Sequence, residues 1–206
     1  MRIVSLVPSL TLTLFDLGLD ATSIVGRTPW CIHPAEQVSD VPVVGGTKTP
    51  TLSKIKGAQP DLVVMDRDEN PKSVHDWCVA NGLPTFVCDV RHPRDVPLML
   101  RELGQAVNRS EAAEVHARAI EAMLRRAPDT NGRTALPLIW HRPLMAANGT
   151  TYAGNMLACL GFNVPNIEPD GTGYPEVSPE IILQHGVTDV FLSSEPHEFT
   201  DEESGS

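Results

Sequence analysis

The chain has 206 residues, of which 41% are hydrophobic and 20% are charged, a composition that suits an ordinary globular protein with a sizeable core. Its 26 acidic residues outnumber the 16 basic ones, and the formal net charge of −10 repels nucleic-acid phosphates and anionic lipid surfaces. The longest apolar runs, such as residues 62–65, have the length of a strand, far below the roughly 18 residues that a membrane span needs. We therefore expect a soluble protein that neither binds nucleic acid nor inserts into a membrane.

The N-terminus and the cysteines bear on where the protein works. Met1 and Arg2 lead directly into an apolar run at residues 3–7, without the longer apolar stretch and small-residue cleavage site of an export signal. The sequence as written predicts a cytoplasmic protein, or a periplasmic one if a signal has been removed. The four cysteines, at positions 31, 78, 88 and 159, are too few and too scattered for a disulfide scaffold, so we expect reduced thiols.

Short apolar runs alternate with helix-like segments in the first half of the chain. Helices are expected over residues 9–17, 52–58 and 72–81, and strands over residues 3–7, 23–26, 41–44, 60–65 and 85–88. Strands that are apolar throughout and alternate with helices indicate a parallel sheet covered on both faces.

A longer helical region follows, with helices expected over residues 98–107 and 110–127. The second of these begins with Ser110 and Glu111 and ends with Arg125 and Arg126, charges that match the helix macrodipole at both ends. Its length and its Ala-rich apolar stripe indicate a helix packed against other parts of the protein.

A second α/β series completes the chain, with strands expected at 136–140 and 189–193 and helices at 155–160 and 179–185. The predicted fold class is therefore α/β with two lobes, each built on a parallel sheet, and a long helix that connects them. The expected divisions are an N-terminal lobe over residues 1–107, a connecting helix over 108–130 and a C-terminal lobe over 131–206.

Signatures of the common enzyme classes fail when they are tested against this sequence. Gly45-Gly46-Thr47-Lys48-Thr49 looks like a phosphate loop, but residue 41 is Val where that loop needs Gly, and Pro50 follows where a helix should begin. The dinucleotide-binding glycine pattern and the nucleophile elbow of α/β-hydrolases are also missing from the sequence.

Cysteines and histidines form three closely spaced pairs that zinc would accept, at positions 31 and 33, 75 and 78, and 88 and 92. The pairs lack the tandem spacing of a structural zinc site, and Cys78 and Cys88 occupy positions typical of buried thiols on a helix and a strand. Cys31 and His33 lie in a predicted loop, where packing and function are equally good interpretations. Whether a metal is coordinated stays open.

Five segments, taken together and in order, resemble the class III substrate-binding proteins of ABC importers, the helical-backbone group. These segments are RIVSLVPSLTLTLFDLGL, VGRTPWCIHP, VPVVGGTKTPTLSKIKGAQPDLVVM, YPEVSPEIIL and DVFLSSEP. The likeness spans nearly the whole chain and is strongest to the cobalamin-binding-like branch, especially its members without export signals.

The resemblance implies two α/β lobes joined by the helix at residues 110–127, with a corrinoid ligand such as cobalamin held in the cleft between them. The implied ligand-binding residues lie on loops at strand ends: Trp30, Cys31, His33, Gly45, Gly46, Thr47 and Tyr174. An aromatic ring on each lobe suits a large flat ligand, because it offers apolar contact at little entropic cost. The less favoured alternative is that Trp30 and Tyr174 pack against their own lobes.

The resemblance also implies that one glutamate per lobe docks onto arginines of a membrane permease, at Glu69 and Glu180. Glu180 has an equally good structural interpretation, since an acidic residue in the first turn of a helix complements the macrodipole. The sequence departs from the family at position 12, which is Leu where Glu is common, and at His141-Arg142. Family members usually continue for several tens of residues past the last segment, so we expect a shortened second lobe.

The expected function is therefore non-enzymatic binding of a corrinoid, with no required cofactor, no catalytic residue and an ABC permease as the implied partner. One alternative is a binder of a ferric chelate or another metal complex, and a cytoplasmic carrier or sensor is a further variant. From a different class, Cys31 and His33 could act as a metal or nucleophile pair in an enzyme, with Glu195 as acid or base. A module that has lost ligand binding is the last alternative.

Overall fold

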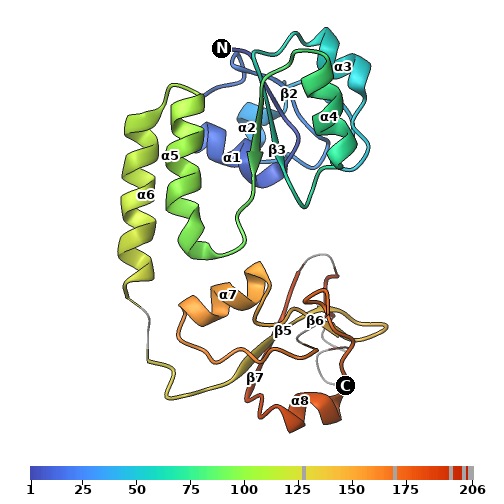
Figure 1. Ribbon diagram of the computed structural model, residues 1–206, viewed down its shortest axis with the longest axis vertical. Coiled ribbons are helices and arrows are strands. Elements are labelled where there is room, and N and C mark those ends of the chain that lie inside the picture. The colour runs from blue at the N-terminus through green and yellow to red at the C-terminus, as the bar shows by residue number, and fades with distance from the viewer. Residues whose placement is uncertain (127–128, 169–170, 195–196, 201–202, 204–206) are drawn as a thin grey trace. The chain divides into compact units, whose positions relative to one another are not determined.

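The computed structural model describes residues 1–126, 129–168, 171–194, 197–200 and 203. The chain divides into two compact units, which are called unit 1 and unit 2 below (Figure 1). Unit 1 comprises Met1–Asp89 and Pro97–Arg118, and unit 2 comprises Val90–Val96 and Ala119–Ser206. The division into residues 1–107, 108–130 and 131–206 stays a prediction.

Unit 1 is built on a parallel sheet with strand order β2-β1-β3-β4. The strands are β1 (Ile3–Ser5), β2 (Ile24–Gly26), β3 (Leu62–Asp66) and β4 (Thr85–Cys88). Helices α3 (Leu52–Gly57) and α4 (Lys72–Ala80) lie on one side of the sheet, and α1 (Pro8–Asp16) and α5 (Val96–Ala106) lie on the other (Figure 1). Because helices cover both faces, consecutive residues of β1 and β3 are buried, and the strands are apolar throughout.

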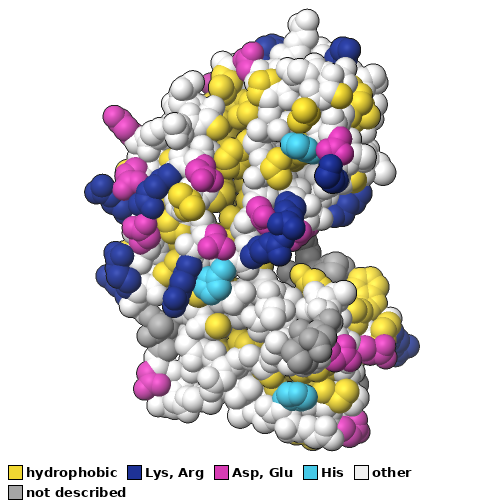
Figure 2. Space-filling view, in the orientation of Figure 1, with side chains coloured by type: hydrophobic (Ala, Val, Ile, Leu, Met, Phe, Trp, Pro, Cys, Tyr) yellow, Lys and Arg dark blue, Asp and Glu magenta, His cyan; other side chains and the backbone are white. Residues whose placement is uncertain are grey.

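Helix α6 (Ser110–Leu124) packs on α5 through a cluster of charged side chains. The Arg101 Nε donates to Glu114 Oε2 and the Arg118 Nε donates to Glu114 Oε1, both at 2.6 Å. These hydrogen bonds to Arg101 and Arg118 hold the pKa of the Glu114 carboxyl at about 2. Figure 2 shows acidic and basic side chains intermixed over this part of the molecule.

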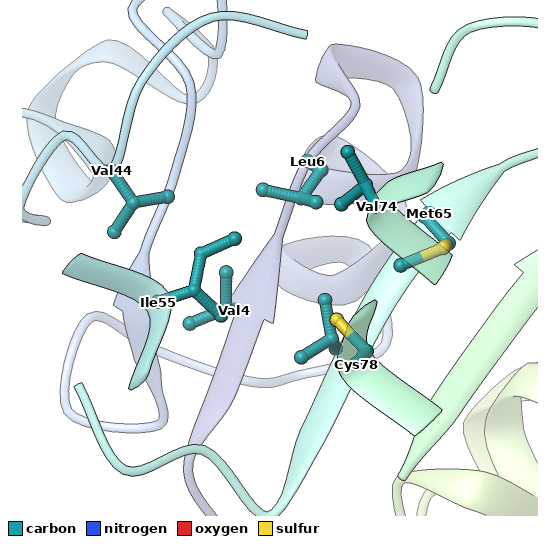
Figure 3. Packing of buried hydrophobic residues seen from close by; sticks show 8 residues of the cluster. Val4, Leu6, Val44, Ile55, Met65, Val74 and Cys78 are labelled. Carbon is teal, nitrogen blue, oxygen red and sulfur yellow. The ribbon is translucent and has the colours of Figure 1, made fainter. Parts of the chain in front are cut away.

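One hydrophobic core of unit 1 lies between the sheet and the helices α3 and α4 (Figure 3). Val4 and Leu6, on β1 and just after it, meet Ile55 of α3 and Cys78 of α4, and all four side chains are buried. Burial raises the pKa of the Cys78 thiol. Cys78 and Cys88 are both buried free cysteines, as the packing interpretation of the sequence expects.

Unit 2 is built on a mixed sheet with strand order β6-β5-β7. β5 (Ala135–Trp140) pairs in parallel with β7 (Asp189–Leu192) and antiparallel with β6 (Met145–Ala146). This unit contains α7 (Tyr152–Cys159), α8 (Pro179–Gln184), a 3-10 turn at Pro93–Asp95 and the last turns of α6. A small core gathers Leu136, Leu138, Ala146, Ile167 and Val177.

The α/β prediction is confirmed, and three local expectations need correction. Residues 41–44 are not a strand, because their pairing amounts to one isolated bridge between Arg27 and Val43, and the carbonyl of Val44 accepts from the Thr51 N–H of the following loop instead of continuing a ladder. Helix α2 (Ala35–Val38) and the antiparallel strand β6 were not predicted. The helix expected over 110–127 ends at Leu124, and residues 127–128 lie outside the described residues.

None of the helices in the described ranges combines the length and the apolar character that crossing a membrane requires.

Candidate functional site

The candidate site of unit 1 consists of loops that follow the carboxyl ends of its parallel strands. The chain leaves β2 into residues 27–34, leaves β3 into residues 67–71, and forms the loop 45–50 just after the Arg27–Val43 bridge. Ligands of open parallel sheets bind at this edge, because loops from several strands meet there. The sequence-predicted residues from Trp30 to Thr47, and Glu69, all lie on these loops.

Trp30 stands out on the first loop because its side chain is two-thirds exposed, while the adjacent Cys31 is buried. The Cys31 thiol lies 3.1 Å from the hydroxyls of both Thr11 and Thr28, and both threonines are fully buried. The Thr11 hydroxyl also lies 2.8 Å from the Ser5 hydroxyl at the end of β1. This buried polar cluster ties the loop to β1 and α1, so Trp30 projects from a braced backbone.

The outer part of the same loop is exposed, including His33 and the apolar side chain of Ile32. Cys31 and His33 therefore differ in environment, one shielded among threonines and the other in solvent. The arrangement provides an exposed aromatic and apolar surface with an imidazole beside it in sequence, which suits contact with a large ligand.

The second loop, at Gly45-Gly46-Thr47, needs glycine at its first position. Gly45 has a φ of +118°, and a Cβ there would lie 2.5 Å from the Thr51 nitrogen and 2.8 Å from Pro50 Cα. Gly46 is partly exposed and Thr47 is buried, so the loop offers backbone and little side chain on its surface. A ligand could approach this backbone closely.

Asn70 joins these loops and was not identified in the sequence. Its buried side chain donates to the carbonyls of Thr47 (2.9 Å) and Leu6 (3.3 Å), and its Oδ1 accepts from the Asp66 N–H (2.9 Å). One side chain therefore satisfies backbone groups of three segments. The polar run of residues 66–70, directly after a buried strand, is the signal that could have pointed to it.

Glu69 is exposed on the turn that Asn70 closes. The Asp66 carboxylate accepts from the N–H groups of Asp68 and Glu69, which fixes the turn after β3. Lys48 Nζ lies 3.8 Å from the Glu69 carboxylate and donates to the Asp68 carbonyl. Both charged ends are in water, so this ion pair leaves Glu69 accessible.

In unit 2, Tyr174 is nearly half exposed and follows Gly173, whose φ is +91°. The buried Asn148 holds this segment: its N–H donates to the Gly173 carbonyl, and its Nδ2 donates to the Ile167 carbonyl, both at 2.9 Å. Its Oδ1 accepts from the Thr150 N–H and hydroxyl. The buried Asn148 side chain therefore satisfies backbone groups around the Tyr174 segment, as the buried Asn70 side chain does for the loops of unit 1.

Glu180 lies in the first turn of α8, where Ser178 caps the helix by accepting from the Ile181 N–H. The hydrogen bond from Ser178 lowers the pKa of the Glu180 carboxyl, so this group stays ionised. Its side chain is exposed, which is compatible with both docking and the structural interpretation.

A ring cluster follows the ends of β5 and β7 in unit 2, and the sequence analysis assigned it no role. The rings of His141 and His197 stack with centroids 6.0 Å apart, and Phe199 meets His197 edge-on at 4.8 Å. The Glu203 carboxylate lies 3.2 Å from His197 Nε2, and its pKa is lowered, mainly by the hydrogen bond from the Thr200 N–H. Glu195, the acid or base of the enzyme alternative, lies outside the described residues.

Within the described ranges, His, Cys, Asp and Glu side chains do not gather in a group of three that could hold a metal ion.

Comparison with known proteins places the chain in a family. Residues 3–203 match the family described as periplasmic binding protein. The chain belongs to the periplasmic binding protein family. This agrees with the resemblance that the five sequence segments carry, and that resemblance is confirmed.

Relatives of this periplasmic binding protein include the vitamin B12-binding protein of Pectobacterium carotovorum subsp. carotovorum (strain PC1). It is 23% identical over 202 residues, which cover 95% of this chain and 72% of the relative. Among solved structures, a periplasmic heme-binding protein, RhuT, from Roseiflexus sp. RS-1 matches with a TM-score of 0.78 and 23% identity, over 93% of this chain and 75% of that one.

The periplasmic vitamin B12-binding protein BtuF of Vibrio cholerae has the same TM-score of 0.78 at 19% identity, covering 93% of this chain and 76% of that one. At such identities the solved structures establish the shared fold. The α/β fold of a class III binding protein is therefore confirmed.

Proposed function

We propose that this periplasmic binding protein is the non-enzymatic, ligand-capturing component of an ABC importer, and that its ligand is a corrinoid such as cobalamin. Family membership supports the binding role, and the two vitamin B12-binding relatives from Pectobacterium support the corrinoid. The observation that carries the proposal is Trp30, an exposed aromatic side chain on a loop that buried threonines brace.

The proposed mechanism is capture by prearranged loops, in which no bond is made or broken. An exposed indole offers apolar and stacking contact to a planar macrocycle, and a braced loop loses little conformational entropy when the ligand binds. Gly45, Gly46 and Thr47 would contribute close backbone contact, His33 a polar contact, and Cys31 the anchor of the Trp30 loop. In unit 2, Tyr174 would contribute the second aromatic surface.

Glu69 and Glu180 are proposed to dock onto basic residues of the permease. Both carboxylates are exposed, each sits on a hydrogen-bonded turn or helix start, and the 3.8 Å ion pair of Glu69 with Lys48 is open to water. Charged groups of this kind steer association and set specificity more than they add affinity.

A ferric chelate or heme is the second candidate ligand. The observation that favours it is the stacked pair His141 and His197 in unit 2, because imidazole is a common iron ligand. Heme-binding proteins also stand among the structural neighbours.

The enzyme alternative gains no support from the geometry of Cys31. A nucleophilic thiol must be accessible and have a nearby activating group, whereas the Cys31 thiol is buried between two threonine hydroxyls.

Calorimetric titration of the purified chain with cyanocobalamin, cobinamide and hemin tests the proposal. We expect saturable corrinoid binding with a Kd of about 1 µM or tighter, weakened about tenfold or more by Trp30→Ala. Val115→Ala is the matched control, because Val115 is as exposed as Trp30 but lies on α6, away from the loops. Failure of both corrinoids to bind would overturn the corrinoid proposal, and hemin binding that His141→Ala abolishes would establish the second candidate.

A further inference from the structure

Unit 1 holds a cavity of about 400 Å³ between α4 and the strands β3 and β4, which is called the α4 cavity below. All its lining residues lie between positions 65 and 87, well inside the described ranges. The residues proposed above to bind the corrinoid or to dock onto the permease do not line it. The α4 cavity is therefore a candidate binding site of its own.

The register of the sheet explains the floor of the α4 cavity. Met65 of β3 pairs with Val87 of β4, so both side chains point to the same face of the sheet. This is the face that α4 covers, because Met65 packs in one cluster with Val74 of α4 (Figure 3). Met65 is buried, whereas Val87 is 40% exposed, so the floor is apolar and accessible on the β4 side.

Three basic side chains, those of Arg67, Lys72 and His75, also line the α4 cavity. Arg67 follows Met65 by two positions, and alternation along the chain places its side chain on the same face as the floor. Its Nη1 donates to the Asp89 carboxylate at 2.5 Å. A guanidinium has five N–H donors, so one such bond leaves Arg67 able to donate to a ligand as well.

The carboxylates near these cations do not cancel their attraction for an anion. Lys72 Nζ lies 2.7 Å from both carboxylate oxygens of Asp76, but the Lys72 side chain is 84% exposed, and exposed ion pairs contribute little. Asp76 and Asp89 do not line the cavity. Asp66 does, and its Oδ1 already accepts from two backbone N–H groups of its own turn. The lining therefore carries more basic than acidic groups.

We propose that the α4 cavity binds a small amphipathic anion, namely an aromatic carboxylate whose ring lies on Met65 and Val87 and whose carboxylate is held by Arg67 and Lys72. Bonds from a guanidinium or an ammonium to a carboxylate are stronger than bonds between neutral groups. The apolar floor takes the ring, as in most small-molecule sites. A neutral ring would keep only the apolar contact, so the charge of the ligand decides its affinity.

Titration of the chain with cinnamate, followed by amide NMR spectra, tests the site. We expect saturable shifts centred on residues 65–75 and 85–88, with a Kd of about 0.1–1 mM for so small a ligand. Cinnamamide has the same shape without the charge and should bind about fivefold more weakly or less. Raising the salt from about 0.05 to about 0.5 M should weaken cinnamate far more than cinnamamide.

Variants of the basic side chains test their role. Lys72→Gln changes an exposed side chain that the fold does not need, and Arg67→Gln changes the other cation; each should weaken cinnamate about threefold or more. Lys56→Gln is the matched control, because Lys56 is also exposed and also bonds a neighbouring side chain, Asn81, but does not line the cavity.

The outcome does not depend on corrinoid binding, because these variants leave the proposed corrinoid residues unchanged. Absence of saturable shifts, shifts centred outside residues 65–88, or equal affinity for cinnamate and cinnamamide would overturn the proposal. A loss in Lys56→Gln as large as the loss in Lys72→Gln would also overturn it, since general surface charge would then explain the binding.

Discussion

The side-chain amide of Asn70 donates a 2.9 Å hydrogen bond to the carbonyl of Thr47, and so joins the turn after β3 to the glycine loop of the candidate site. The two residues are 23 positions apart in the sequence, and the same amide also reaches the carbonyl of Leu6 after β1. Three separate segments therefore share one buried polar side chain. Their positions are coupled, which gives the proposed binding surface a fixed shape before any ligand arrives.

Removal of this side chain should affect both stability and binding. Asn70→Ala leaves the Thr47 and Leu6 carbonyls and the Asp66 N–H without their partner, and we expect a loss of about 2–3 kcal/mol in the free energy of unfolding. Urea denaturation measures this loss. Asn81→Ala is the control, because Asn81 also bonds a backbone carbonyl but is exposed, and its loss should cost well under about 1 kcal/mol. Equal costs for the two variants would contradict the coupling role of Asn70.

Gly45 sets the path of the glycine loop, and alanine there should distort it. The positive φ disfavours a side chain, and the added Cβ meets backbone atoms of Pro50 and Thr51 that cannot move aside cheaply. We expect Gly45→Ala to lower the free energy of unfolding by about 1–3 kcal/mol and to weaken corrinoid binding.

Gly57→Ala provides the matched test for Gly45. Gly57 ends α3, and a Cβ there meets nothing within 4 Å, so alanine should be neutral or stabilising by up to about 1 kcal/mol. Thermal melts and calorimetry on the two variants measure both effects. If Gly45→Ala behaved like Gly57→Ala, the tight geometry of the loop would not matter for the site.

Most of the fold could be predicted because its strands are buried on both faces. Residues 62–65 form a continuous apolar run, and the structure places them in β3 with helices on both sides. Residues 41–44 show the limit of this signal: Val41 and Val44 are buried, yet the run forms only one isolated bridge, between Arg27 and Val43, and no strand. An apolar run indicates that its residues are buried, but burial alone does not distinguish a strand from a loop that packs on a core.

The exposed parts of the candidate site could be found from the sequence, whereas the residues that hold them could not. Trp30 and Tyr174 are the aromatic residues to which the family resemblance of their segments points. Asn70 and Asn148 look like ordinary turn residues, and their importance arises from carbonyls 64 and 19 positions away, which only the folded chain brings near. The ring cluster of His141 and His197 was missed for the same reason.

The lowered pKa of the Glu114 carboxyl predicts how the free energy of unfolding depends on pH. Its pKa in the folded chain is about 2, below the ordinary value of 4.5, so the unfolded chain takes up the proton first as pH falls. The stabilisation from its hydrogen bonds to Arg101 and Arg118 is complete above pH 4.5 and is lost progressively toward pH 2.

Melting temperatures of the native chain and of Glu114→Gln between about pH 6 and about pH 3 test this dependence. The native chain should melt higher at pH 6, and the difference should shrink below pH 4.5. Glu111→Gln is the control on the same helix, and its difference from the native chain should change far less over this range. A constant gap between the native chain and Glu114→Gln would contradict the assignment.

The hydrogen bonds of the Asn148 side chain predict that the position of the segment before Tyr174 depends on this one amide. Asn148→Ala removes the donor to the Ile167 carbonyl and the acceptor for Thr150, and the segment before Tyr174 then loses its buried support. We expect about 2 kcal/mol of destabilisation and, among the described residues, faster hydrogen exchange confined to residues 164–168 and 171–174. Asn163→Ala, which removes an exposed side-chain bond to Gly132, should leave that exchange unchanged.

Binding data separate the role of Asn148 in positioning Tyr174 from its effect on the stability of the fold. If Asn148 acts by placing Tyr174, then Asn148→Ala and Tyr174→Ala should each weaken corrinoid binding by about tenfold, and the double variant should be no weaker than Tyr174→Ala alone. Calorimetry at a temperature where all variants are folded measures the three affinities. Additive losses in the double variant would show that the two residues act independently, and an unchanged affinity in Tyr174→Ala would remove the tyrosine from the proposed site.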